Sequence, residues 1–347
     1  MEKMKIGIIG CGRIARAAHI PSYLKCEDVE IKYFCDIIPE KAQDCVEKYN
    51  TGIAVADYHD VISDPEVVAV SICTPNMAHK FISIDALRAG KHVLCEKPMA
   101  VTLAECEAMV AAAEESGKYL MIGQNQRLAM AHAKAKELIE QGAIGKVLTF
   151  RTIFGHGGPE TWSIDPGSNV WFFDKTKAAM GAMADLGIHK TDIIQYVLGS
   201  KIVKTQAVLT TLDKKDATGS LIGVDDNAIC IYQMENGIIG TMTASWTYYA
   251  AEDNTTVIYG TKGELRLYDD PKYSVQQINA DGTRIDYQID QIQTNDNQTA
   301  SGIIDLFVDC LVEKKEPEIS GANVLHAMKA VFASIESSAK GCVIEVK

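Results

Sequence analysis

Residues 5–15 read KIGIIGCGRIA, and this stretch decides the fold of the first part of the chain. An apolar run with strand character leads into a turn with glycine at two positions, and a run compatible with a helix follows from Ile14. Gly10 permits the tight turn, Gly12 lets the backbone approach a diphosphate, and Ala15 lets the helix lie close to the strand. The helix would begin with its N-terminus toward the phosphates. The pattern G-x-G-x-x-A therefore predicts a dinucleotide-binding turn.

An acidic residue in the expected place supports this prediction. Residues 29–36 form a second predicted strand, and they end in Asp36. A carboxylate about 20 residues after the turn can bind both ribose hydroxyls and repels a 2′-phosphate, so NAD is favoured over NADP. Ile37 and Ile38 follow without a Ser-Arg pair, which also favours NAD. Arg13 offers one positive charge near the adenosine phosphates, which leaves NADP open as the less favoured cofactor.

The composition is that of a globular protein. The chain has 347 residues, 47% of them apolar and 23% charged, which is long enough for two domains. The net charge of -12 argues against nucleic acid or an anionic membrane as a partner. The longest charge-free stretch, 236–251, is too short to span a bilayer, and the early turn leaves no room for a secretory leader. Ten cysteines without a C-x-x-C pair indicate reduced thiols and a cytoplasmic protein.

Strand and helix patterns alternate up to about residue 128. This alternation predicts a doubly wound parallel sheet, in which ligands bind beyond the carboxyl ends of the strands. That rule gathers residues 10–13, 36, 74–76 and 96–98 around one crevice. The expected strands, besides the first two, are 53–56, 67–73, 92–95 and 119–123, and the expected helices are 39–49, 57–63, 78–89 and 102–116.

After a helix at 131–141, residues alternate by twos. The expected strands are 147–154, 203–211, 227–234, 238–247, 255–260 and 264–268, with helices at about 178–197, 300–313 and 322–339. Asn236-Gly237 predicts a two-residue hairpin turn, so a large antiparallel sheet is expected. We divide the chain into a dinucleotide-binding domain, 1–128, and an α+β substrate-binding domain, 129–347.

One face of this sheet is expected to lack a helical cover. Trp246, Tyr248 and Tyr249 would add apolar surface to it, which favours a homodimer or homotetramer through the sheet. The loop 161–177 is rich in Gly, Asp, Trp and Phe and is a natural rim or lid.

A second group of polar residues lies in residues 181–192, GAMADLGIHKTD. On a helix, Asp185 and His189 share a face. A carboxylate beside an imidazole fixes its tautomer and raises its pKa, which suits a general base. A surface ion pair is the alternative without function. A metal site with Asp192 as third ligand is the less favoured one, and we expect no metal.

Four motifs in this order and spacing resemble the Gfo/Idh/MocA oxidoreductases. They are the glycine turn, T-P-N-x-x-H at 74–79, G-K-H-V-x-x-E-K-P at 90–98 and D-x-G-x-H-x-x-D at 185–192. The resemblance covers essentially the full length. It implies a Rossmann domain followed by an α+β domain with a large, open-faced and mainly antiparallel sheet, as in inositol dehydrogenase and glucose–fructose oxidoreductase.

The resemblance also implies the site residues. Lys97 and His189 would be the catalytic pair, and Asp185 would orient His189 or bind substrate hydroxyls. The alternative for Lys97 is that it only positions the cofactor. The alternative for His79 is that it only caps or packs against the helix. The implied cofactor contacts are Gly10, Gly12, Arg13, Ile14, Asp36, Thr74, Asn76, His79, Glu96 and Lys97.

The chain departs from the family pattern at a few positions. Ala179-Met180-Gly181 stands where a glycine run is frequent, which could narrow the pocket. Met130 lies where a proline is frequent.

These residue types suit oxidation of a secondary hydroxyl in a sugar or polyol. His189 would accept the proton and Lys97 would stabilise the developing alkoxide, or the two roles would be exchanged. Trp162 and Trp171 could face a sugar ring, with lid packing as the alternative. Further candidate substrate contacts are Arg127, His156 and Asn169.

Two other functions remain open on the same scaffold. One is a non-catalytic regulator that senses the dinucleotide, and the other is a glycoside hydrolase assisted by NAD. Only a dehydrogenase would accumulate NADH.

Overall fold

The computed structural model describes residues 3–164, 166–291 and 301–347. Its internal contacts divide the chain into two compact units. The first comprises Met1–Gln124 and Asn295–Leu325, and the second comprises Asn125–Thr294 and His326–Lys347. The C-terminal segment 301–325 thus belongs to the same unit as the glycine turn.

The first unit contains a six-stranded parallel sheet in the order β3-β2-β1-β4-β5-β6. This confirms the predicted doubly wound arrangement. The isolated pairing of Met121 with Ser320 extends the sheet beyond its last strand. The strands are β1 Met4–Ile9, β2 Val29–Cys35, β3 Ile53–Val55, β4 Val67–Ile72, β5 His92–Cys95 and β6 Leu120–Ile122.

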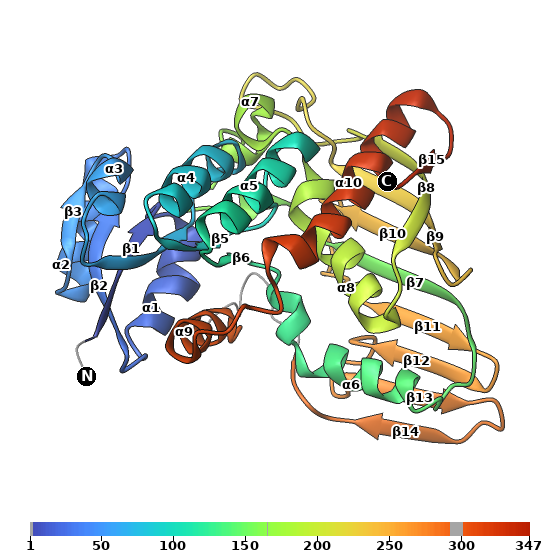
Figure 1. Ribbon diagram of the computed structural model, residues 1–347. Coiled ribbons are helices and arrows are strands. Elements are labelled where there is room, and N and C mark those ends of the chain that lie inside the picture. The colour runs from blue at the N-terminus through green and yellow to red at the C-terminus, as the bar shows by residue number, and fades with distance from the viewer. Residues whose placement is uncertain (1–2, 165, 292–300) are drawn as a thin grey trace. The chain divides into compact units, whose positions relative to one another are not determined.

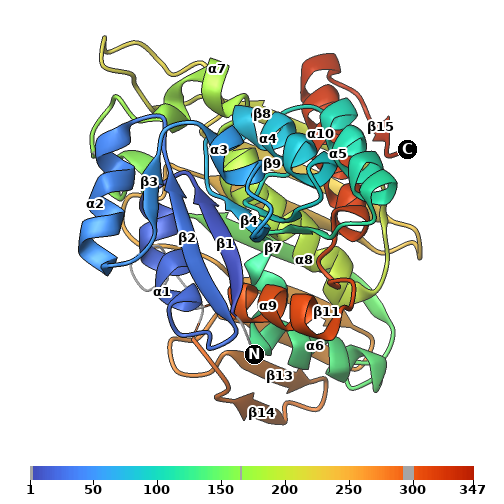
Figure 2. The same cartoon turned by 60° about the vertical axis from the view of Figure 1, so that its left-hand side comes forward.

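Helices cover both faces of this sheet. Helices α4 and α5 lie side by side on one face, and α1 and α9 on the other (Figure 1; Figure 2 turns the strands β1 and β2 toward the viewer). The helices are α1 Ile20–Tyr23, α2 Pro39–Tyr49, α3 Tyr58–Ile62, α4 Asn76–Arg88, α5 Leu103–Ser116 and α9 Ile303–Glu313.

Local sequence signals explain where these helices begin and end. Thr102 accepts a hydrogen bond from the backbone N–H of Glu105, and Gly117 ends α5 in the left-handed conformation at φ 63°. Helix α4 begins at Asn76, earlier than predicted, because Pro75 is extended and its carbonyl already accepts the N–H of Ala78. The helix after the glycine turn starts as a π-helical turn, Ala15–His19, rather than as a regular α-helix.

The second unit contains a nine-stranded sheet in the order β14-β13-β12-β11-β7-β10-β9-β8-β15. The hairpin between β9 and β10 is confirmed, with Gly237 at φ 85°. The sheet is mixed, because β7 and β10 run parallel while the other pairs are antiparallel. The strands are β7 Val147–Gly155, β8 Ile202–Thr210, β9 Asn227–Met234, β10 Ile239–Ser245, β11 Thr256–Gly260, β12 Gly263–Leu267, β13 Val275–Asn279, β14 Arg284–Tyr287 and β15 Ile344–Glu345.

The sequence did not predict β13, β14 and β15. The first two carry several polar residues and lie at one edge of the sheet, so their hydrophobic alternation is weak. The third has only two residues. The predicted helix 178–197 begins later in the structure, as a π-helical turn Met183–Gly187 that continues into α8 Ile188–Leu198, and a separate short helix, α7 Lys175–Ala178, precedes it.

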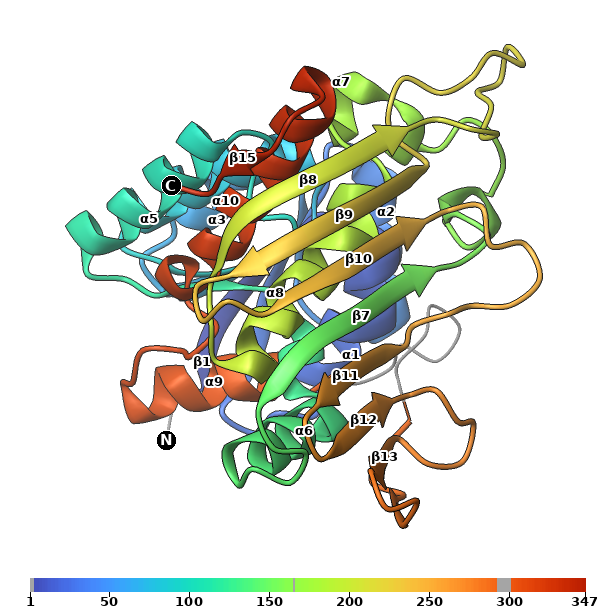
Figure 3. The same cartoon turned by 90° about the vertical axis from the view of Figure 1, so that its right-hand side faces the viewer.

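One face of the second sheet is covered by helices of the same unit. These are α6 Met130–Glu140, α8 and the later part of α10 Gly321–Lys340 (Figure 3). Ser334 and Ser337 of α10 are hydrogen-bonded to β8. No helix of the described residues covers the opposite face, which the viewer sees in Figure 3.

The prediction that Trp246 lies on this uncovered face is wrong. Along β10 the buried residues include Gly240, Met242 and Ala244, so the alternation itself places Trp246 on the covered side of the sheet, and Trp246 is fully buried. Tyr249 is 60% exposed. The exposed apolar side chains on the open face are Val208, Ile229, Ile231 and Ile239.

Candidate active site

The two glycines of the turn differ in their surroundings. Gly10 has φ +94°, and a Cβ there would lie 2.7 Å from the carbonyl carbon and oxygen of Cys73. A Cβ at Gly12 would meet no atom within 4 Å. Gly10 is therefore required for the turn itself, whereas Gly12 leaves open the space that a diphosphate would need. Arg13 and Ile14 follow it and are half-buried.

Asp36 is held beside this turn by two backbone groups. Its Oδ2 accepts the N–H of Cys11 and its Oδ1 accepts the N–H of Ile38, both at 2.9 Å. Ile37, which lies between Asp36 and Ile38 in the sequence, is 89% exposed. The carboxylate is thus fixed at the strand end where the sequence predicts a ribose contact.

His79 joins the two loops that follow β4 and β5. It is buried, with Nδ1 2.8 Å from the carbonyl oxygen of Pro98 and Nε2 2.9 Å from that of Thr74. Burial lowers the pKa of His79, although the two carbonyl groups oppose this shift. Asn76, at the start of α4, is also buried. His79 therefore connects the T-P-N and E-K-P motifs within one unit.

Glu96 belongs to a hydrogen-bonded chain that the sequence did not reveal. Its Oε1 lies 2.8 Å from Nε2 of buried His19. The other ring nitrogen of His19, Nδ1, lies 2.8 Å from Oγ of Ser71, and the hydroxyl of Tyr23 also donates to this Ser71 oxygen. Burial would raise the pKa of Glu96, but the hydrogen bond and charge of His19 and the charge of Lys97 lower it. The backbone N–H of Lys97 donates to Oε2 of Glu96 at 3.2 Å. Glu96 thus positions the backbone of the half-buried Lys97.

In the second unit, Asp185 and His189 are buried, with 7% and 6% of their surfaces exposed. This burial is inconsistent with a surface ion pair. Asp185 lies in the π-helical turn, a wider turn than the α-helix assumed from the sequence, and His189 lies in α8. The indole N–H of Trp246 donates to Oδ2 of Asp185 at 3.0 Å.

Asp225, which the sequence did not single out, holds the start of this π-helical turn. Its carboxylate accepts the backbone N–H groups of Gly181 and Met183 at 2.8 and 2.7 Å. A Cβ at Gly181 would lie 1.8 Å from the carbonyl oxygen of Asp225. Only glycine therefore fits at this position without a backbone shift.

Five rings connect His189 back to Asp185, and we call them the aromatic circuit. Adjacent ring centroids lie 6.2, 5.8, 6.2, 5.2 and 6.5 Å apart, beginning at His189. The last ring donates the hydrogen bond to Asp185. The rings, in this order, are Phe154, His156, Trp162, Phe172 and Trp246.

The circuit brings together several of the predicted substrate residues. His156 and Trp162 belong to it, and Trp171 stacks on Phe172 with centroids 3.9 Å apart. Arg127 instead forms a bidentate ion pair with Asp192, at 2.7 and 2.5 Å. Asn169 is exposed in the loop before Trp171. The arrangement offers apolar ring surfaces next to a carboxylate and an imidazole, which is a chemistry suited to a sugar.

Two other classes of site are absent from the part of the chain that the structure describes. No three His, Cys, Asp or Glu side chains there are grouped in a way that could hold a metal ion. No helix there is both long and apolar enough to cross a membrane.

Comparison with known families gives two matches. Residues 4–124 match the oxidoreductase family with an NAD-binding Rossmann fold. Residues 132–266 match the GFO/IDH/MocA C-terminal domain.

Individual relatives agree with these matches. Levoglucosan dehydrogenase of Pseudarthrobacter phenanthrenivorans is 30% identical over 290 residues, which cover 76% of this chain and 73% of the relative. Myo-inositol 2-dehydrogenase of Thermotoga maritima is 28% identical over 262 residues, covering 76% and 74%. A solved levoglucosan dehydrogenase, in complex with NADH and levoglucosan, superimposes with a TM-score of 0.86 at 26% identity and full coverage of both chains.

Proposed function

This chain belongs to the Gfo/Idh/MocA oxidoreductases, and we propose that it oxidises a secondary hydroxyl of a sugar or polyol with NAD as hydride acceptor. That it is an NAD-binding oxidoreductase of the sugar dehydrogenase type follows from the family and its relatives. The observation that carries the finer proposal is the aromatic circuit, because it closes on the carboxylate of Asp185 and the imidazole of His189. The relatives give no support to a regulator or to an NAD-assisted glycoside hydrolase.

The residues of the first unit fit a bound dinucleotide. The open space at Gly12 admits a diphosphate, and Asp36 presents an ordered carboxylate for the ribose. NAD, when bound, supplies the hydride acceptor. We assign Thr74, Asn76, His79 and Glu96 to the loops near its nicotinamide half, as the family pattern implies. We propose residues 1–128 as the dinucleotide-binding domain and 129–347 as the substrate domain, although the segment 301–325 belongs to the first compact unit.

The protein groups handle the proton. We assign His189 as the base that accepts the hydroxyl proton, with Asp185 fixed by Trp246 as a contact for substrate hydroxyls. Lys97 would donate to the same substrate oxygen and stabilise its developing charge, and the opposite assignment of the two roles stays open. His156, Trp162 and Trp171 would contact the sugar ring, and Arg127 and Asn169 are the more peripheral candidates.

A spectrophotometric screen tests this function. Polyols, aldoses and nucleotide sugars are offered with NAD, and we expect at least one class to accumulate NADH. Lys97→Ala and His189→Ala should each lower kcat by about 100-fold or more while NAD affinity stays nearly unchanged. Lys134→Ala is the control, since Lys134 pairs with Glu137 on the surface of α6. Full turnover by His189→Ala would disprove the base assignment.

The preference for NAD is tested at Asp36. Asp36→Ala should weaken NAD binding by about 10-fold and lessen the discrimination against NADP, because the ribose loses its acceptor and the 2′-phosphate loses its repulsion. Titration calorimetry with both cofactors measures this change. Unchanged binding of both would remove the argument from charge.

We also propose that the chain forms a homodimer or homotetramer through the open face of the second sheet. Val208, Ile229, Ile231 and Ile239 are each more than half exposed there, which supports burial by a second copy. All ten cysteines, each within the described residues, are free, which supports the proposed cytoplasmic location.

A further inference from the structure

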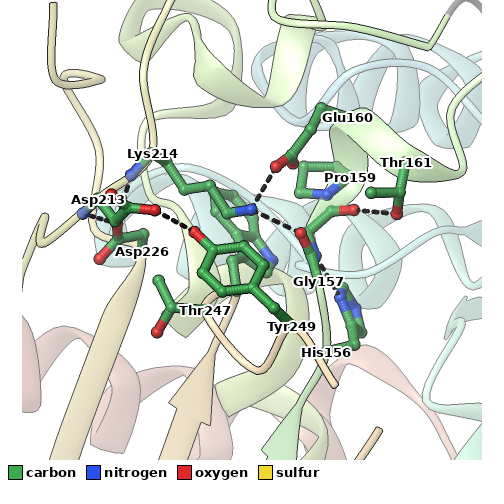
Figure 4. Close-up of polar contacts among 12 residues, drawn as sticks. His156, Gly157, Pro159, Glu160, Thr161, Asp213, Lys214, Asp226, Thr247 and Tyr249 are labelled. Atoms are coloured by element: carbon green, nitrogen blue, oxygen red, sulfur yellow. Dashed lines mark hydrogen bonds and ion pairs between the residues drawn. The ribbon is translucent and has the colours of Figure 1, made fainter. Parts of the chain in front are cut away.

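Lys214 is a buried cation that none of the proposed chemistry uses. It lies in the segment between β8 and β9, and its side chain is only 4% exposed (Figure 4). The carboxylate of Asp226 fixes the backbone around it by accepting the N–H groups of Leu212, Asp213 and Lys214 at 2.8, 2.8 and 2.9 Å. The ammonium group is thus presented from a rigid support.

Three different groups surround this ammonium. It donates to the carbonyl oxygen of Gly157 at 2.6 Å and forms an ion pair with Glu160. The ring centroid of Tyr249 lies 4.5 Å from it, and the hydroxyl of Tyr249 donates in turn to Asp213. A cation that binds a carbonyl, a carboxylate and an aromatic face at once constrains the geometry of all three.

The backbone at Gly158 passes very close to the side chains of Glu160 and Lys214. Gly158 has φ +96°, and a Cβ there would lie 2.5 Å from Oε2 of Glu160 and 3.0 Å from Nζ of Lys214. Thr161 donates to the carbonyl oxygen of Gly158 at 2.7 Å, and the N–H of Gly158 donates to Nδ1 of His156 at 2.9 Å. The segment 157–160 is therefore held both internally and by Lys214.

This segment connects two members of the aromatic circuit. His156 precedes Gly157, and Trp162 lies two residues after Glu160, so Lys214 binds the chain between the two rings. We propose that Lys214 is a positioning residue that fixes His156 and Trp162 for substrate binding. The proposal rests on the proposed function, since it assumes that the aromatic circuit contacts the sugar.

A purely structural role is the competing explanation. A buried ion pair adds little net stability compared with apolar side chains of similar volume, because the desolvation of both charges offsets their attraction. An apolar residue would fill the same space, but it would not bind the carbonyl of Gly157. The choice of a lysine thus points to control of conformation.

The test is Lys214→Met, which keeps an unbranched side chain of most of the length and removes the charge. We expect KM for the sugar to rise by about 10-fold, with kcat changed by less than about threefold and NAD affinity unchanged. Lys214→Arg, which keeps the charge and the donors, should recover part of the loss. Lys134→Met is the matched control on the surface of α6 and should leave KM unchanged.

Glu160→Ala keeps the test decisive if Lys214→Met does not fold, because Glu160 lies nearer the surface, with 22% of its side chain exposed. Its KM should also rise while kcat is retained. A wild-type KM in either folded variant would overturn the positioning role. If the wild-type enzyme itself oxidised no sugar or polyol, the proposed function would fail instead, and the two failures are therefore distinguishable.

Discussion

The two units present different kinds of groups to their proposed ligands. In the first, backbone geometry dominates: Gly10 makes the turn, Gly12 leaves open space, and Asp36 is fixed by the N–H groups of its neighbours. In the second, side chains dominate: the rings of the aromatic circuit contact His189 at one end and donate a hydrogen bond to Asp185 at the other. A backbone surface suits a group common to many ligands, such as a diphosphate, whereas side chains can be exchanged for a new substrate without altering the fold.

Each unit contains a buried lysine that binds backbone carbonyl groups, but the two lysines are not compensated equally. In the first, the ammonium of Lys91 donates to the carbonyl oxygens of Asp64 and Val67, both at 2.7 Å. In the second, Lys190 is fully buried next to His189, and its ammonium donates to the carbonyl oxygen of Asn254 at 3.1 Å without an ion pair to any described carboxylate. The second unit therefore carries the larger electrostatic cost, in the residue next to its catalytic candidate.

The largest expected effect separates the two glycines of the turn. Gly10→Ala should destabilise the protein by about 3 kcal/mol or prevent folding, because its Cβ meets the backbone of Cys73 and its φ is left-handed. Gly12→Ala should leave the unfolding midpoint nearly unchanged and weaken NAD binding by about 10-fold or more. Urea unfolding and calorimetry measure the two quantities separately. Equal loss of stability in both variants would contradict the view that backbone space at Gly12 is reserved for the cofactor.

A smaller effect concerns Lys190 and its dependence on pH. Burial lowers the pKa of Lys190 to about 7, against the attraction of Asp253 and Glu252. Between about pH 7 and 10.5 the unfolded chain then holds a proton that the folded chain has lost, so the free energy of unfolding rises with pH, by up to about 1.4 kcal/mol per unit. Lys190→Met should remove this contribution and be the more stable protein at pH 7. Urea unfolding at several pH values measures it.

Other titrating groups do not disturb this comparison. Burial lowers the pKa of neighbouring His132 to about 3, which places its titration below the window. The remaining groups cancel in the difference between the variant and the wild type. Lys134→Met, at the surface of α6, should follow the wild-type profile. Parallel profiles for Lys190→Met and the wild type would mean that Lys190 keeps an ordinary pKa in the fold.

The first unit could be predicted closely because its signals are local. The glycine turn, the apolar strand β4 and the Thr102 and Gly117 caps each act within a few residues, and the strand order follows from right-handed crossovers. The pairing of His19 with Glu96 joins residues far apart in the sequence, and no local pattern indicates it.

In the second unit, most of the contacts that build the site join residues that lie far apart in the sequence. Trp246 was counted among the side chains of the open face because the sequence does not show which face the helices cover, and its hydrogen-bond partner, Asp185, lies 61 residues away. Lys214 and Asp225 come from a segment without any motif, yet Lys214 binds the loop between two of the rings and Asp225 holds the turn that carries Asp185. The spacing of the D-x-G-x-H motif singles out Asp185 and His189, but no sequence pattern predicts that the aromatic circuit connects them.

The smallest expected effect is at Ala179, where the backbone of the second unit is strained. Ala179 has φ 64° and ψ −39°, a combination that crowds the Cβ of an L-residue, and it stands where a glycine is frequent in the family. Ala179→Gly should relieve about 1–3 kcal/mol of strain and lose roughly 0.5–1 kcal/mol through the greater freedom of the unfolded chain, for a net gain of about 1 kcal/mol in urea unfolding.

Ala133→Gly, at an exposed position inside α6, provides the matched control. It makes the same chemical change in regular helix and should destabilise the protein by about 1 kcal/mol. If the two variants change the free energy of unfolding in opposite directions, the backbone just before Gly181 and Asp185 is strained. This strain would lie in the unit whose site is otherwise built from side chains. If both variants lost the same stability, the backbone there would be relaxed, and the contrast between the two units would be sharper than the structure indicates.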